Sequence, residues 1–87
     1  MKDYDLLIAA HVVDHLLSLR TAERALLRAH FEEIRRSPMT FSDYTERDEV
    51  GRDLDINLFG KHAIIFWCDA ADKHVKILDL VPSDRPR

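Results

Sequence analysis

The chain has 87 residues, of which 46% are hydrophobic and 33% are charged, and its formal net charge at pH 7 is −3. This length favours a single domain, residues 1–87, with a thin core, because a chain of this size buries only roughly 60–65% of its unfolded surface. The acidic balance argues against general nucleic-acid affinity, since proteins that bind phosphate backbones usually present a basic surface.

Cysteine content and hydropathy indicate the compartment. The only cysteine, Cys68, excludes an intramolecular disulfide and fits a reducing cytoplasm. The chain opens without a secretory leader, and no apolar run reaches the roughly 18–20 residues of a membrane helix. We therefore expect a soluble cytoplasmic protein that does not associate with membranes.

The first third of the chain predicts a short strand and the start of a helical hairpin. Residues Tyr4–Ala9 are short and apolar, with Tyr4, Leu6 and Ile8 on one side, which favours a strand. The residues that follow have the i, i+3, i+4, i+7 spacing of one helical face; they are Ala9, Val12, Val13 and Leu16.

A second helix is predicted from about Ala22 to Arg36, with Thr21 as its N-cap. Its buried face would hold Leu27, Phe31 and Ile34. The short link between the two helices indicates an antiparallel hairpin. Residues Ser37–Gly51 are polar and contain proline and glycine, so we expect a long loop there.

Three strands are predicted in the rest of the chain. Leu54, Ile56 and Leu58 alternate with polar residues, as in a strand with one face in water. After a turn at Gly60 and Lys61, Ala63–Cys68 is apolar on both faces, as in a central strand. A turn at Ala70–Lys73 leads to a last strand, His74–Val81, with Val75, Ile77 and Val81 on one face.

The predicted class is α+β: strand, helix, helix and a three-stranded antiparallel meander, with the helical hairpin packed on one face of a small, mostly antiparallel sheet.

Three features of the sequence could belong to an active site: two pairs of residues and one cysteine. His11 and His15 stand at i, i+4, but we expect a solvated helix face there and no metal. Asp53 and Asp55 share a strand face, where alternating acids usually serve solubility. The apolar neighbours of Cys68 favour a core thiol over a nucleophile. No cofactor is predicted.

Cations near the predicted strand ends are the candidates that remain. Arg47 and Arg52 precede the second strand, Lys61 and His62 flank the next turn, and Arg85 follows the last strand. Such groups could stabilise the phosphorane-like transition state of RNA cleavage. Taken one by one, they are better explained as ordinary surface charges, and strand ends on opposite edges of the sheet need not converge.

The chain resembles the RelE/ParE superfamily of toxins from bacterial type II toxin–antitoxin systems. Nearly the whole chain takes part in this resemblance, through the order of its elements and four local features. These are the helix LRTAERALLRAHFEEIRRSP, the pair Gly51-Arg52, the turn and strand GKHAIIFW, and the ending VKILDLVPSDR.

The resemblance implies a growth-inhibiting toxin that a cognate antitoxin neutralises by wrapping its surface. RelE-like members cut messenger RNA on the ribosome with clustered cations, an arginine near the end of the last strand and often a C-terminal tyrosine. Arg52 and Arg85 stand where two such cations would fall, and Lys61 and His62 would add phosphate contacts.

Departures from the nuclease pattern favour the ParE-like branch, which binds DNA gyrase. Asp55 and Asn57 replace lysines, Ala63 stands in place of an arginine, and the sequence ends at Arg87 without the tyrosine. A ribosome-dependent endoribonuclease and a non-toxic binding module are the alternatives.

Overall fold

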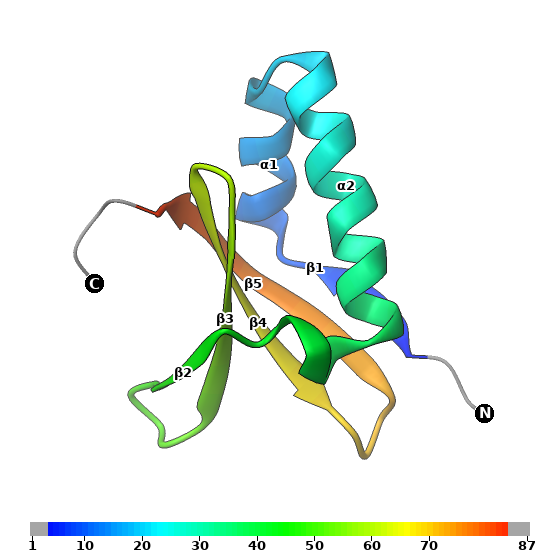
Figure 1. Cartoon of the computed structure of the whole chain (residues 1–87). Coiled ribbons are helices and arrows are strands. Elements are labelled where there is room, and N and C mark those ends of the chain that lie inside the picture. The colour runs from blue at the N-terminus through cyan, green and yellow to red at the C-terminus, as the bar shows by residue number, and fades with distance from the viewer. Residues whose placement is uncertain (1–3, 84–87) are drawn as a thin grey trace.

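A computed structural model of the chain describes residues 4–83. It contains a helical hairpin and a five-stranded sheet (Figure 1). The elements follow one another as β1 (Asp5–Ile8), α1 (Ala10–Ser18), α2 (Thr21–Arg36), the 3₁₀ turn η1 (Pro38–Phe41), β2 (Tyr44–Arg47), β3 (Asp53–Phe59), β4 (His62–Asp69) and β5 (His74–Pro82). The predicted α+β class is confirmed.

The sheet has the strand order β1-β5-β4-β3-β2. β1 runs parallel to β5, and the other neighbouring strands are antiparallel. The two helices lie side by side across β1 and β5 (Figure 1). The predicted hairpin on a mostly antiparallel sheet is thus confirmed. Of the helices within residues 4–83, neither is long and apolar enough to cross a membrane.

The main core lies between the hairpin and the sheet. Both helices and the two central strands contribute fully buried side chains to it, namely Val12, Leu16, Leu27, Phe31, Ile34, Ile64, Phe66, Val75, Ile77 and Leu80. Burying each of these side chains stabilises the fold by about 1.5–3 kcal/mol before the entropy of ordering is subtracted. The buried faces predicted for the helices are largely confirmed, although Val13 is 38% exposed.

A second apolar cluster occupies the other face of the sheet. Ile56, Ala63 and Ile65 are almost completely buried there, at 0%, 1% and 2% exposure. Half-buried side chains of the neighbouring strands, Leu54, Leu78 and Val81, pack around them. β4 is therefore covered on both faces, as its continuous apolar sequence predicts.

A β-bulge in β5 changes which residues face the helices. Ile65 pairs with Asp79 and Phe66 pairs with Ile77, so Leu78 is the extra residue. An extra residue reverses the inward and outward alternation beyond it. Leu80 therefore joins the helix-side core, and the predicted placing of Val81 beside Val75 and Ile77 is wrong.

The prediction of a long loop at Ser37–Gly51 is also wrong, because this segment contains η1 and the edge strand β2. β2 has the sequence YTER and is mostly exposed, so it carries no alternation of buried and exposed residues. It is held by backbone pairing to β3, in which Tyr44 lies opposite Ile56 and Arg47 opposite Asp53.

The start of α2 differs from the prediction by one residue. Thr21 is the first helical residue, the N-cap position belongs to Arg20, and no side chain caps this end of the helix. The N-cap role predicted for Thr21 is wrong. Its hydroxyl instead lies 3.5 Å from the Arg24 guanidinium.

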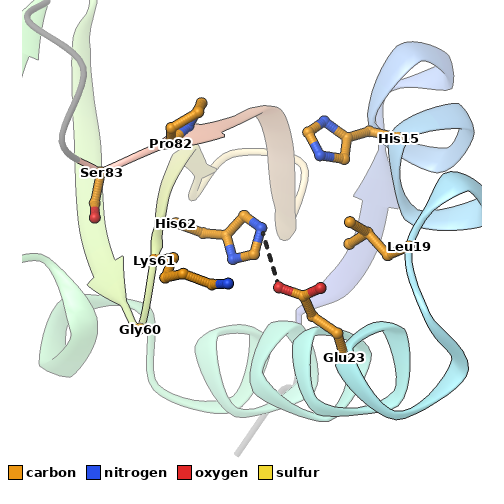
Figure 2. A pocket seen from close by; sticks show the side chains of 8 residues that line it. All are labelled: His15, Leu19, Glu23, Gly60, Lys61, His62, Pro82 and Ser83. Carbon is orange, nitrogen blue, oxygen red and sulfur yellow. Dashed lines mark ion pairs between the residues drawn. The ribbon is translucent and has the colours of Figure 1, made fainter.

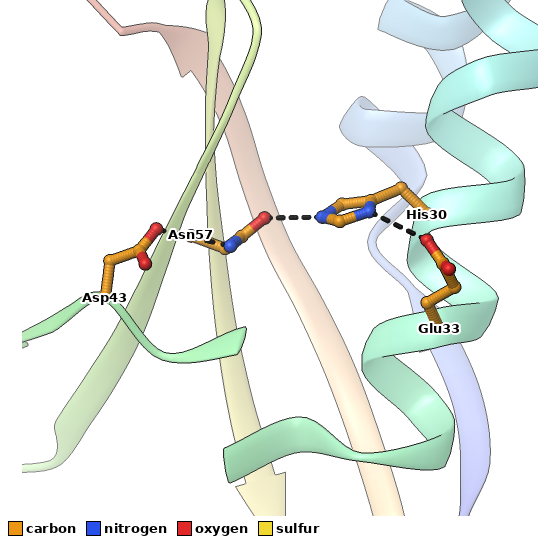
Figure 3. A network of polar contacts seen from close by, with 4 residues as sticks. All are labelled: His30, Glu33, Asp43 and Asn57. Atoms are coloured by element: carbon orange, nitrogen blue, oxygen red, sulfur yellow. Dashed lines mark hydrogen bonds and ion pairs between the residues drawn. The ribbon is translucent and has the colours of Figure 1, made fainter. Parts of the chain in front are cut away.

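The polar side of β3 faces the helices and is buried. Asp55 and Asn57 are only 9% and 5% exposed, so the predicted wet face is wrong at these positions. The Asn57 carbonyl oxygen lies 2.6 Å from Nε2 of the buried His30 (Figure 3). The Asn57 amide nitrogen donates to Asp43 at 3.2 Å.

Asp43 fixes the orientation of this network. A carboxylate only accepts, so the NH₂ group of Asn57 points to Asp43 and its oxygen points to His30, whose Nε2 must donate. The other ring nitrogen of His30 lies 3.1 Å from Glu33, and Phe59 stacks on the ring at 3.9 Å. The network therefore fastens α2 to β3 and to the segment that leads into β2.

We expect Asn57→Leu to reduce the free energy of unfolding by about 1–3 kcal/mol, because His30 loses its buried acceptor. Urea unfolding measures the change. The control is Glu33→Ala, which removes a partner that is 55% exposed and should cost less than about 1 kcal/mol. Equal losses in the two variants would contradict the role given to Asn57.

Candidate functional site

An open pocket of about 530 Å³ lies between the helical hairpin and the turn that joins β3 to β4 (Figure 2). It draws side chains from four parts of the chain, and its lining residues are His15, Leu19, Glu23, Gly60, Lys61, His62, Pro82 and Ser83. This volume is within the range of small-molecule sites, which is about 300–1,000 Å³.

Two neighbouring strand ends form one wall of the pocket. Gly60 has φ +59°, a left-handed conformation that glycine adopts without strain, and it lets β3 turn into β4 directly before His62. The backbone N–H of Ser83 donates to the Lys61 carbonyl at 2.8 Å, which holds the end of β5 beside this turn. The opposite wall comes from the helices through His15 and Glu23 (Figure 2).

His62 is the most buried ionisable group of the pocket, at 9% exposure. Its Nε2 lies 3.7 Å from a carboxylate oxygen of Glu23, and its ring meets that of His15 edge to face at 6.2 Å. Burial lowers the pKa of His62 below its usual 6.5; Glu23 opposes this shift, while His15 and Lys61 add to it. The imidazole is thus mainly neutral at pH 7 and able to accept a proton.

Two of the four predicted site residues meet in this pocket and a third does not. Lys61 and His62 both line it. Arg52 stands at the other end of β3, about 20 Å away by strand rise. Arg85 lies outside the described residues, two positions after Ser83 in the sequence.

Arg52 makes contacts with a carboxylate and an aromatic ring at its own end of β3. Its Nε donates to Asp48 at 2.7 Å, and its guanidinium lies 5.0 Å from the centre of the Trp67 ring. Lys76 approaches the same ring at 4.9 Å. Together these contacts form a cation–π cluster at the end of the sheet remote from the pocket.

The remaining candidates lie apart from the pocket. Arg47 pairs with Asp53 at 3.3 Å on the exposed edge of the sheet. Asp55 accepts a hydrogen bond from Ser42 at 2.7 Å. The expected core thiol of Cys68 is only half-buried, and its hydrogen bond with Tyr4 raises the pKa of that phenol.

His11 and His15 diverge in the structure. His11 pairs with Asp79 at 3.3 Å, whereas His15 is half-buried against His62, so the expected solvated face is wrong for His15. No group of three or more His, Cys, Asp or Glu side chains within residues 4–83 is placed to hold a metal ion.

Sequence reasoning missed the contribution of His15 and Glu23 to the pocket. The only sequence signal was their chemistry, because both precede the strand residues they meet by about forty positions or more. Their approach to His62 depends on how the hairpin docks on the sheet.

Comparison with known proteins finds a relative by structure but none by family model or among curated proteins. No protein-family model matches the chain, and no curated protein does. Among solved structures, the chain matches RelE in the archaeal RelE–RelB complex from Pyrococcus horikoshii OT3, with a TM-score of 0.80 and 25% sequence identity. The match covers 98% of this chain and 100% of that one.

The chain is of the RelE/ParE type. The resemblance inferred from the sequence is thereby confirmed. Within this RelE-type fold, the three departures from the nuclease pattern are all buried. Asp55 bonds Ser42, Asn57 bonds His30, and Ala63 lies in the second apolar cluster at 1% exposure.

The pocket geometry predicts how His62 titrates. Its pKa should lie below 6.5, and Glu23→Gln should lower it further, because the carboxylate of Glu23 favours the imidazolium. Since the folded state binds this proton less readily than the unfolded state, His62 should destabilise the fold as pH falls below about 6.5.

NMR titration of the imidazole resonances measures this pKa. Glu33→Gln is a matched control, because Glu33 contacts His30 and not His62. A His62 pKa above 6.5, or one that moves equally in the two variants, would refute the assigned electrostatics.

Proposed function

We propose that this protein is the toxin of a toxin–antitoxin pair, that it inhibits growth, and that a cognate antitoxin protein neutralises it. The observation that carries the proposal is the match over the full chain to RelE of a RelE–RelB complex. We place its action in the cytoplasm, where its free thiol Cys68 would stay reduced.

Its action would be to bind a cellular target, with DNA gyrase as the first candidate, as in the ParE-like branch. RNA cleavage needs several cations around one phosphate. Here Arg52 is paired with Asp48 and remote from Lys61, and Asp55 and Asn57 are used in buried contacts. These features support binding over cleavage.

The alternative is a ribosome-dependent messenger RNA endoribonuclease, which the pocket in Figure 2 favours. A mainly neutral His62 could accept the proton of an attacking ribose hydroxyl, and Lys61 could offset charge on the phosphate. Arg85 would add a contact inferred from the family, whereas Arg52, which is paired with Asp48 at the other end of β3, would not reach the same phosphate. A third hypothesis is that the protein is a non-toxic binding module.

Induced expression of the protein should arrest growth, and co-expression of the small protein encoded beside it should restore growth. The measurement is colony formation with and without the neighbouring gene. A frameshifted copy of that gene serves as control. Unchanged growth in several hosts would overturn the toxin proposal.

The mode of action can be read in arrested cells. Target binding predicts trapped gyrase–DNA complexes and intact transcripts, and it predicts that His62→Ala and Arg85→Ala still arrest growth. Cleavage predicts fresh 5′ ends in messenger RNA that disappear in these two variants. Arg47→Ala, which alters an exposed pair away from the pocket, is the control.

A further inference from the structure

The outer edge of β2 is open. β2 is the last strand of the sheet, on the side opposite β1, and Figure 1 shows it away from the helical hairpin. Three of its four residues, Tyr44, Thr45 and Arg47, are exposed. An open edge can pair with a strand of another chain, and proteins prevent this with proline, a β-bulge or charges that repel. β2 contains no proline, and its register with β3 runs without a bulge.

Backbone pairing shows which groups of β2 point to this open edge. Asp48, which continues the ladder by one residue after β2, donates its N–H to the Arg52 carbonyl at 2.9 Å. Hydrogen-bonded and non-hydrogen-bonded pairs alternate along an antiparallel ladder. The even-numbered residues of β2 therefore bond to β3. The N–H and C=O groups of Thr45 and Arg47 point away from the sheet, and β3 is the only strand within residues 4–83 that pairs with β2.

Two-fold symmetry limits the register in which two such edges can pair. Identical antiparallel strands in one sheet are related by a two-fold axis perpendicular to it, so each face of one copy continues as the same face of the other. Because directly opposed residues share a face, one residue must lie opposite its own copy. Glu46 in that place would oppose two like charges, which is unfavourable. Thr45 in that place would exchange both backbone hydrogen bonds with its own copy, because its N–H and C=O point to the open edge.

The charges of β2 are self-complementary in the register centred on Thr45. Arg47 then lies opposite Asp43 of the second copy, and opposite charges on directly opposed residues favour pairing. The same register keeps Glu46 away from its own copy. Arg47 can change partner at little cost, because its pair with Asp53 joins side chains that are 70% and 67% exposed. The charges of this edge thus favour a second copy of the chain instead of repelling it.

Exposed apolar side chains lie just beyond both ends of β2. Val50, in the turn to β3, is 78% exposed, and Met39, in η1, is 64% exposed. When the register centred on Thr45 is continued, position 50 falls opposite position 40 of the second copy, next to Met39. The turn of each copy would therefore approach η1 of the other, and both apolar side chains would lose contact with water.

We propose that the chain forms a two-fold symmetric homodimer, in which β2 pairs antiparallel with β2 of a second copy and Thr45 lies on the axis. The two sheets become one continuous sheet, with both helical hairpins on the same side. The pocket around His62 lies between the hairpin and the start of β4, away from this edge, so it stays open in the dimer. Dimerisation therefore goes beyond the proposed toxin function and does not depend on it.

Sedimentation equilibrium of the full chain measures the association. The interface is short, so we expect a dimer with a Kd on the order of 10–100 µM. Thr45→Pro removes an N–H that β3 does not use, and it should raise the Kd at least about tenfold. Thr45→Val keeps the N–H and the branched shape, and it should change the Kd less than about twofold. Circular dichroism should show that both variants are folded.

Oxidative cross-linking tests the register itself. In a Cys68→Ala background, Thr45→Cys should form a disulfide with its own copy, because directly opposed Cα atoms lie about 5.5 Å apart. Arg47→Cys is the matched control on the same exposed strand, since its two copies would be offset by about 13 Å along the strands.

Three results would overturn the proposal: a chain that stays monomeric up to about 1 mM, equal cross-linking of the two cysteine variants, or an unchanged Kd for Thr45→Pro. A further contrary result concerns a different occupant of the edge. If the chain stays monomeric while an extended peptide of another protein protects the Thr45 amide from hydrogen exchange, the edge belongs to that partner and not to a second copy.

Discussion

The fold depends on burying strand β4 on both of its faces. Ile64 and Phe66 face the helical hairpin, while Ala63 and Ile65 face the second apolar cluster. A strand of this kind lies inside the sheet; here the hairpin covers one face, and side chains of the neighbouring strands surround the apolar residues of the other face. Alternation then places His62, the first residue of β4, on the same face as Ile64. The burial of His62 against the helices, and with it the lowered pKa of its imidazole, follows from the packing of the core.

The polar residues of β3 show that the alternation of polar and apolar residues in a strand does not determine which face is buried. Alternation separates Leu54, Ile56 and Leu58 from Asp55 and Asn57, but it does not say which set faces the helices. Leu54 and Ile56 join the second cluster, whereas Leu58 remains 50% exposed. The polar set is buried because His30 of α2 and Ser42, which follows η1, provide hydrogen-bond partners for it. A buried polar group without such a partner would cost about 1–3 kcal/mol, so this assignment depends on residues far away in the sequence.

Strong periodicity explains what could be predicted from the sequence. α2 and the strands β3, β4 and β5 carry clear patterns, and they occur within one or two residues of the predicted limits. β2 could not be predicted because an exposed edge strand has no buried face and so shows no alternation. The face predicted for Val81 was wrong because the bulge at Leu78 arises from how β5 pairs with β4, which the sequence of β5 alone does not show. At the site, Lys61 and His62 adjoin in sequence and could be predicted together. Glu23 reaches them only through helix docking, and the length of β3 keeps Arg52 away.

The net charge of −3 conceals an uneven distribution that bears on mechanism. Arg47, Arg52 and Lys76 are tied to carboxylates on or beside the sheet. On α2, Arg28 has no carboxylate partner among residues 4–83. Cations promote cleavage of a phosphodiester when they converge on the one reacting phosphate. A binding surface has no such requirement, because charges spread over many ångströms still steer and orient a partner. Lys61 at one end of β3, Arg52 about 20 Å away and Arg28 on α2 cannot serve one phosphate together. They can serve separate contacts on one large partner, which supports the proposed action by binding.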